Sequence, residues 1–265
     1  MITKFSLGNV LALGFRTWAR NFLPFTLLTL MVYAPLLLWG ISVAQEGEDS
    51  SAYFHEINRF VIYSPGLVVV LSILVSSAVT YGAVMDLRGQ RATLGACFAV
   101  GLRRFFPAVG VLFLMMLCGI GLYLIVALPL GLVFAPFGVL VLIPVIAVLY
   151  AMLWLYTSMY VAMQACVIER PGIAASLGRS RDLTRGHKIA IGVLAILLVV
   201  CNFGLNKLVE QLTLPGEHYT AYIYAALARD VLIGSVGAVM ASVAYYLLRA
   251  EKEGTSADEL AAVFD

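Results

Sequence analysis

The sequence predicts an all-α integral membrane protein. Hydrophobic residues make up 62% of the 265 positions and charged residues only 12%, whereas soluble domains contain about 25% charged residues. Mean hydropathy is +0.96, and residues 105–168 contain no Asp, Glu, Lys or Arg. Because one membrane-crossing helix needs about 20 apolar residues, this uncharged segment accommodates two crossings and a turn. A soluble chain of this length could not bury so much apolar surface.

Hydropathy divides the chain into six expected transmembrane helices. They lie at residues 22–44, 60–85, 106–128, 137–165, 189–212 and 231–248. An uncharged turn with Pro129 and Pro136 joins the third to the fourth, and Pro144 is expected to bend the fourth. Arg229 and Asp230 are expected to anchor the outer end of the sixth, and residues 251–265 to form a short polar tail.

The distribution of positive charge predicts the orientation. Fourteen of the 17 Lys and Arg residues lie in the amino-terminal segment, the second loop, the fourth loop and the tail, all on one side of the expected membrane. Only Arg59, Lys207 and Arg229 fall elsewhere. The positive-inside rule then places both termini in the cytoplasm. We expect a bacterial cytoplasmic (inner) membrane, because polar loops of this kind and four cysteines without paired spacing fit that setting.

Amphipathic segments precede three of the spans and indicate a weak repeat. Residues 7–18 and 94–105 carry apolar side chains at the same helical spacing, which predicts helices lying in the membrane interface. Similar tripeptides open the three segments: Ser6-Leu7-Gly8, Thr93-Leu94-Gly95 and Ser176-Leu177-Gly178. The pattern favours a single domain, 1–265, built from three units of interfacial helix plus transmembrane hairpin, at 1–86, 87–168 and 169–250. Chance similarity between apolar segments explains the pattern equally well.

The third amphipathic segment is cationic where the other two are apolar. Arg181, Arg185 and Lys188 are spaced to share one face of a helix at the cytoplasmic surface, with Arg179 beside them. Ser176 is expected to cap this helix, and residues 170–172 to form the turn before it. Guanidinium groups match the geometry of phosphate oxygens, and each base near an anionic membrane contributes about 1 kcal/mol.

We therefore predict a site for anionic lipid headgroups or a protein partner at four residues. They are Arg179, Arg181, Arg185 and Lys188. A second interpretation stays open, in which these bases only fix the topology and keep a loop solvated.

No constellation of catalytic or metal-binding residues is apparent. The three histidines lie in three different loops, and the cysteines lack C-x-x-C spacing. Ser235, between two glycines, has no base at its expected depth in a neighbouring span. We expect a non-enzymatic protein without cofactor or metal, acting in the phospholipid membrane and without nucleic acid. A channel or transporter for a small solute or lipid is the alternative function, and a lipid-modifying enzyme comes third.

Two short stretches resemble a known family. Residues 169–186 contain E-R-P-G and S-L-G-R-S-R-D-L-T-R-G, and residues 245–254 read Y-Y-L-L-R-A-E-K-E-G, before a terminal L-A-A-V-F-D. They resemble the bacterial glycerophosphoryl diester phosphodiesterase membrane domain and its stand-alone relatives. The resemblance implies a multi-helix membrane module that is sometimes fused to a soluble phosphodiesterase barrel. We expect no such activity here, because the residues after Arg249 are too few for the barrel.

Overall fold

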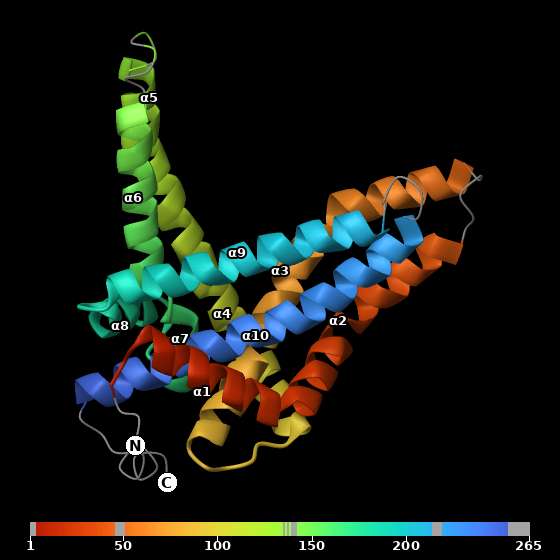
Figure 1. The fold of residues 1–265 in the computed structure, drawn as a ribbon, viewed down its shortest axis with the longest axis horizontal. Coiled ribbons are helices and arrows are strands. Elements are labelled where there is room, and N and C mark those ends of the chain that lie inside the picture. Colours follow the sequence, from red (N-terminus) through yellow and green to blue (C-terminus); the bar gives the residue numbers. More distant parts are fainter. Residues whose placement is uncertain are drawn as a thin grey trace. The chain divides into compact units, whose positions relative to one another are not determined.

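The computed structural model describes residues 4–45, 51–134, 136, 138, 142–213 and 219–253. Within these ranges the chain forms ten α-helices and one π-helical turn, and no strand (Figure 1). In order they are α1 (Leu7–Arg20), α2 (Phe22–Gln45), α3 (Ser51–Leu87), α4 (Leu94–Leu122), η1 (Tyr123–Ala127), α5 (Leu128–Phe134), α6 (Leu142–Met159), α7 (Ala162–Ile168), α8 (Ile173–Thr184), α9 (Lys188–Thr213) and α10 (Tyr219–Glu253). The predicted all-α class is confirmed.

Six helical segments are long and apolar enough to cross a membrane. They are Phe22–Val43, Ile57–Leu87, Leu94–Phe134, Pro144–Ile168, Lys188–Thr213 and Ala221–Glu253. Each overlaps one span expected from hydropathy, so the chain is a multi-pass helical membrane protein. Most of the predicted tail, residues 254–265, and part of the turn before α6 lie outside the described residues. The threefold repeat is not tested by these observations and stays a prediction.

The second expected interfacial helix is not a separate element. Residues 94–105 continue without a break into the third span as α4, and Pro107 lies inside this helix. No glycine between Leu94 and Leu122 adopts a positive φ that would end it. Further along, the Leu128 N–H bonds to the Tyr123 carbonyl, five residues back, which makes the π-helical turn η1. Pro129 and Gly131 lie inside α5 rather than in a turn.

The expected bend at Pro144 is wrong. Pro144 lies in the first turn of α6, where its missing N–H costs no helical hydrogen bond. The interruption instead falls at Val161, whose φ of −104° and ψ of 14° are not helical, and it separates α6 from α7. The fourth span therefore ends as a short second helix that leads directly into the cationic segment.

Arg229 and Asp230 lie inside α10, which begins well before the expected start of the sixth span. The Arg229 guanidinium pairs with the Asp230 carboxylate at 2.7 Å and also donates to the Asn206 side chain on α9. Because each charge has a partner, the helix continues through both residues without an unpaired ion.

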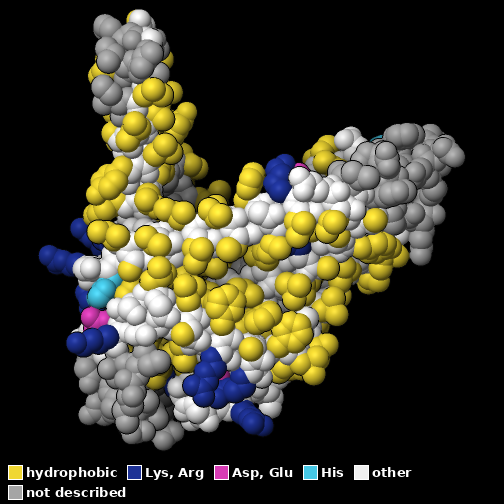
Figure 2. Space-filling model, viewed as in Figure 1, with side chains coloured by type: hydrophobic (Ala, Val, Ile, Leu, Met, Phe, Trp, Pro, Cys, Tyr) yellow, Lys and Arg dark blue, Asp and Glu magenta, His cyan; other side chains and the backbone are white. Residues whose placement is uncertain are grey.

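Large apolar side chains cover the outside of the third and fourth spans. Ile125 is 77% exposed and Tyr150 is 70% exposed, and many hydrophobic side chains lie on the surface over α5 and α6 (Figure 2). Contacts join α5 and η1 to α6, so the two spans run side by side (Figure 1). An apolar surface of this extent is unfavourable in water and is typical of contact with lipid or with another membrane protein.

Contacts between residues divide the chain into two compact units. The first comprises Met1–Asn9, Phe106–Ala195 and Ala244–Asp265, and the second comprises Val10–Phe105 and Ile196–Val243. In the first unit, Val111 on α4 packs against Ala162 and Cys166 on α7, and Leu177 on α8 covers the same cluster. α8 is thereby held against two other helices through its apolar side.

The second unit packs α1 and α10 closely together, and α3 and α4 likewise. The Trp18 indole N–H on α1 donates to Ser235 Oγ on α10 at 3.0 Å, and Gly14 contacts Met240 on the same two helices. Gly101 on α4 lies directly against Ala78 on α3. Small residues at such crossings allow helix backbones to approach within a membrane, where van der Waals packing replaces the hydrophobic effect.

Replacing Gly101 tests this packing. A Cβ at Gly101 would lie 2.8 Å from the Ala78 Cβ, whereas a Cβ at Gly95 on the same helix meets nothing within 4 Å. We expect Gly101→Leu to lower stability by about 1–3 kcal/mol through overpacking, and Gly95→Leu to leave it nearly unchanged. The measurement is the melting temperature of each purified variant in detergent. Equal melting of the two variants would contradict this helix contact.

Candidate functional site

A sharp turn after α7 sets the start of the cationic helix α8. Arg170 has a φ of 60° and Gly172 a φ of 97°, so the turn lies where it was predicted. The predicted role of Ser176 is wrong, because Gly172 occupies the N-cap position and α8 begins at Ile173. Ser176 is instead inside the first turns of the helix, and its Oγ donates to the Gly172 carbonyl at 2.6 Å.

One face of α8 is polar yet fully buried. Ser180 and Thr184, one helical turn apart, both donate to the Ser158 carbonyl near the end of α6, at 2.9 and 3.4 Å. Carbonyls in the last turn of a helix have no partner within their own helix. The two hydroxyl groups supply that partner. They therefore orient α8 and belong to the interior, not to the predicted cationic surface.

The adjacent face of α8 carries the bases that form a pocket. A cavity of about 430 Å³ is lined by Trp154, Gly178, Arg181, Asp182, Arg185 and Lys188, and we call it the α8–α9 pocket. The three bases were expected to share one helix, which is wrong: α8 ends at Thr184, and Lys188 begins α9. The chain turns between them at Gly186, whose φ of 98° favours glycine. The bases nevertheless converge, from both sides of the turn.

The α8–α9 pocket contains more positive charge than the protein neutralises. Arg181 and Arg185 are exposed, and neither has an ion-pair or hydrogen-bond partner among the described residues. Asp182 is the single acidic side chain in the lining. Lys188 Nζ lies 3.4 Å from the centre of the Trp154 ring, a cation–π contact that holds the ammonium in place. The pocket is therefore suited to an anion with several oxygen acceptors.

Arg179, the fourth predicted binding residue, is engaged elsewhere. Its Nε donates to Glu169 Oε2 at 2.7 Å, and its Nη2 donates to Glu253 at the end of α10. Tyr245 donates to the other Glu169 oxygen at 2.7 Å, and Arg249 Nε donates to Glu253 at 2.7 Å. We call these five residues the Glu169 network. Burial lowers the pKa of Arg179, but the hydrogen bonds to the two carboxylates raise it by a larger amount. The net shift is upward, so the group stays charged.

A second group of contacts joins the end of α10 to the turn around the α8–α9 pocket. His187 Nε2 lies 3.3 Å from Glu251 Oε1, and the Phe5 backbone N–H donates to the same carboxylate at 2.6 Å. The Phe5 and His187 rings meet edge to face at 5.0 Å. Lys252 Nζ donates to the Asp182 carbonyl at 2.5 Å. The turn that carries Arg185 is thus held by the carboxyl-terminal part of α10.

The structure brings together three of the four predicted site residues, Arg181, Arg185 and Lys188, and assigns Arg179 to an internal network. Two contributors were missed. Trp154 lies in an apolar segment, and its only sequence signal is the preference of tryptophan for membrane interfaces. Glu169 is the single acid at the start of the loop, and sequence spacing does not reveal that Arg179 and Tyr245 both reach it.

Other candidate sites have structural explanations. Ser235 Oγ accepts the Trp18 N–H and donates to the Leu232 carbonyl at 2.8 Å, so its hydroxyl serves packing. In the part of the chain that the structure describes, no three His, Cys, Asp or Glu side chains lie close enough to hold a metal ion. All four cysteines are free thiols.

Neutralising Glu169 tests the network that positions α8. Glu169→Gln keeps the shape of the side chain but removes the charge opposite Arg179, and we expect a loss of about 1–3 kcal/mol in the free energy of unfolding. Asp182→Asn on α8 is the control, because its exposed carboxylate makes no hydrogen bond or ion pair among the described residues. Both variants are compared by thermal unfolding in detergent. Unchanged melting of Glu169→Gln would show that the network does not stabilise α8.

Comparison of the chain with protein-family models, with curated proteins and with solved structures found no match. The resemblance to the glycerophosphoryl diester phosphodiesterase membrane domain therefore rests on residues 169–186 and 245–254 alone and stays a prediction. The α8–α9 pocket and its charges are the basis on which a function can be proposed.

Proposed function

We propose that this multi-pass membrane protein is a non-enzymatic module that binds anionic phospholipid headgroups at the α8–α9 pocket. The observation that carries the proposal is the grouping of Arg181, Arg185 and Lys188 around one cavity with a single acid. We further propose that this face is cytoplasmic, with both termini on that side of a bacterial inner membrane, as the charge bias favours.

The position of the pocket along the helices supports a lipid ligand. Lys188 is the first residue of the fifth membrane-crossing helix, so the bases lie where a span emerges from the apolar region. Phosphate groups of lipids lie at that depth, and the potential of anionic lipids attracts bases there. Trp154 is suited to the same boundary, because its ring packs against hydrocarbon while Lys188 covers its face.

The chemistry of the side chains supports an anion over other ligands. Each unpaired guanidinium offers parallel N–H donors that match two phosphate oxygens. Arg181 and Arg185 repel Lys188 when no anion is present, and a bound phosphate would relieve that repulsion. A channel or transporter remains the alternative, but no specific observation favours it: the π-helical turn in the third span carries apolar side chains apart from Tyr123.

The proposal is tested by neutralising the two unpaired arginines. We expect the double variant R181Q/R185Q to lose about tenfold or more in affinity for an anionic phospholipid, because each base contributes about 1 kcal/mol near such a headgroup. The measurement is native mass spectrometry of protein released from nanodiscs that contain phosphatidylglycerol and phosphatidylcholine. Raising the salt concentration should weaken the wild-type preference, since exposed charges are screened.

The matched control is R16Q/R103Q, which removes two exposed bases that neither line the α8–α9 pocket nor have a partner among the described residues. It should retain the preference for phosphatidylglycerol. If both double variants lose the lipid equally, total charge and not the pocket decides binding. If neither variant changes lipid retention, the bases act only as topology signals and the proposal is wrong.

A further inference from the structure

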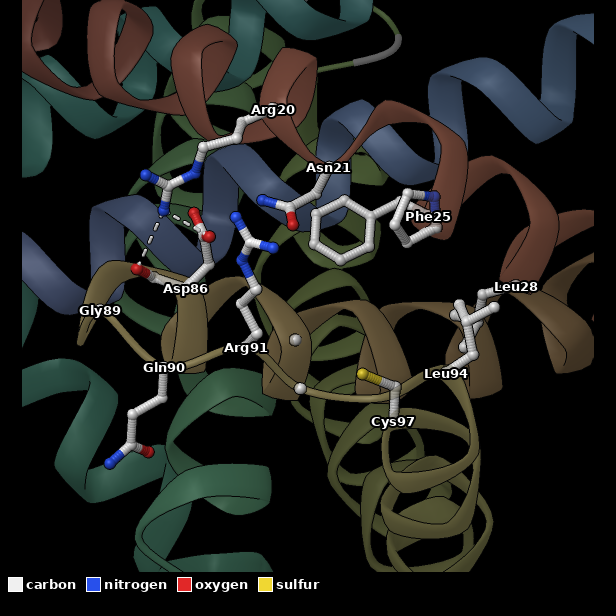
Figure 3. A pocket seen from close by; sticks show the side chains of 13 residues that line it. Arg20, Asn21, Phe25, Leu28, Asp86, Gly89, Gln90, Arg91, Leu94 and Cys97 are labelled. Atoms are coloured by element: carbon white, nitrogen blue, oxygen red, sulfur yellow. Dashed lines mark hydrogen bonds and ion pairs between the residues drawn. The ribbon is translucent and has the colours of Figure 1, made fainter.

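A second cavity, within the second unit, has a different chemical character. It has a volume of about 470 Å³ and lies between the end of α1, the start of α2, the end of α3 and the start of α4 (Figure 3). Asp86, Arg20 and Arg91 are its charged lining residues, and Phe25, Leu28 and Cys97 are among its apolar ones. We call it the Asp86 pocket. Several apolar side chains line it, whereas Trp154 is the one apolar side chain that lines the α8–α9 pocket.

Asp86 occupies an unusual position for an acid. It is the penultimate residue of α3, and the helix ends there in a glycine-terminated cap: the Gly89 N–H donates to the Asp86 carbonyl at 3.0 Å and the Gln90 N–H to the Met85 carbonyl at 2.9 Å. The carboxyl end of a helix carries partial negative charge and favours cations. A buried acid at this end is therefore unfavourable unless cations neutralise it.

One cation from the protein satisfies only part of Asp86. Arg20 Nη2 pairs with Oδ1 and also donates to the Asp86 backbone carbonyl at 3.2 Å. The Asp86 side chain is only 9% exposed, and Oδ2 is buried without a hydrogen-bond partner among the described residues. A buried oxygen left without a donor costs about 1–3 kcal/mol. Asp86 Oδ2 can therefore accept a hydrogen bond from a second cationic group, and no described residue donates one.

Arg91 supplies the opposite feature. It is exposed, has no ion-pair or hydrogen-bond partner within the described ranges, and lines the same cavity. In Figure 3 its guanidinium points into the cavity, on the side of Asn21 and Arg20. An unpaired guanidinium in a pocket offers N–H donors to phosphate oxygens. The pocket therefore offers a place for an ammonium at Asp86 and a place for a phosphate at Arg91.

The wall of the pocket indicates what carries these groups. Phe25, Leu28 and Cys97 are almost fully buried in the unit and line the cavity. Gly82 allows this wall to close, since a Cβ there would lie 2.9 Å from the Phe25 ring. A small zwitterion in water would gain nothing from such a surface, whereas the glycerol and first acyl carbons of a lipid would.

We propose that the Asp86 pocket binds the phosphoethanolamine headgroup of a phospholipid, with the ammonium donating to Asp86 Oδ2 and the phosphate accepting from Arg91. The site is independent of the α8–α9 pocket in its residues and in its ligand class, a zwitterion rather than an anion. It gives the protein a means to select lipids by the N–H donors of the headgroup.

Retention of lipids by the purified full-length chain tests the proposal without any substitution. Nanodiscs would contain phosphatidylethanolamine, its N-monomethyl and N,N-dimethyl forms, and phosphatidylcholine, all with the same acyl chains. Each methylation removes one of the N–H groups that can donate to Oδ2, and phosphatidylcholine has none. We therefore expect retention in native mass spectrometry to fall along the series, by about tenfold from first to last and with the largest step at phosphatidylcholine. Equal retention of all four lipids would overturn the proposal.

Two substitutions separate the two contacts. Asp86→Asn should abolish the preference within the series, because the amide replaces the charged acceptor. Arg91→Gln should weaken all four lipids by a similar factor and preserve the preference, because every headgroup has the same phosphate. Arg103→Gln, which removes an exposed base on α4 that does not line the cavity, should change neither. If Asp86→Asn does not fold, the wild-type lipid series still tests the ammonium contact and Arg91→Gln still tests the phosphate contact. Unchanged lipid retention in Arg91→Gln would overturn the phosphate contact.

Two further arms identify the source of the ligand and isolate the site. Soluble phosphoethanolamine should compete with the lipid only at large excess, because it cannot use the apolar wall. If the free compound binds while the lipid is not retained, the phospholipid assignment is wrong. The variant R181Q/R185Q should keep the full ethanolamine preference, so that failure of the anionic site and failure of the Asp86 pocket are distinguishable.

Discussion

Glu169 lies at the end of the fourth membrane-crossing segment, and its two oxygens each accept a hydrogen bond from a different helix. Arg179 on α8 bonds one oxygen and Tyr245 on α10 bonds the other, both at 2.7 Å. Removing one partner of a largely buried ion pair leaves an uncompensated charge, which is far more costly than losing a surface pair. This constraint fixes α8 in place together with the Ser180 and Thr184 hydroxyl groups, which bind a carbonyl at the end of α6. The adjacent face of α8, which carries Arg181 and Arg185, remains exposed to external ligands.

The bases of this chain fall into two groups with different physical roles. Arg179, Arg229 and Arg20 each have a carboxylate partner that neutralises the charge, and each guanidinium also bonds to another element of its unit. Arg181, Arg185 and Arg91 have no such partner among the described residues, and all three line cavities. A cation exposed to water needs no ion-pair partner for stability. An unpaired base that lines a cavity is therefore available to bind an anion from outside. The first group maintains the fold, and the second group is available for recognition.

The six spans could be predicted because apolar runs of more than about 20 residues have few stable alternatives to a transmembrane helix. The continuity of α4 could not, because residues 94–105 show the same helical periodicity whether or not the helix goes on beyond them. The inward position of Ser180 and Thr184 could not be predicted for a similar reason: hydroxyl side chains at helical spacing face water or a carbonyl with the same sequence pattern. The convergence of Arg181 and Lys188 was predicted, but through one continuous helix, whereas Gly186 turns the chain between them.

Asp86 is the residue whose role charge counting along the sequence could not predict. In the second loop it is the one acid beside four bases, and the net charge of the loop does not distinguish it. Its structural environment distinguishes it: Asp86 lies at the carboxyl end of α3, is nearly buried, and has one oxygen without a donor in a pocket that an unpaired arginine also lines. Three cations without a carboxylate partner attract any anion of suitable size, so we expect the proposed anion site in the α8–α9 pocket to discriminate mainly by charge. A buried acceptor and a separate cation require donor and acceptor on one ligand, so the Asp86 pocket discriminates by the arrangement of groups within a headgroup.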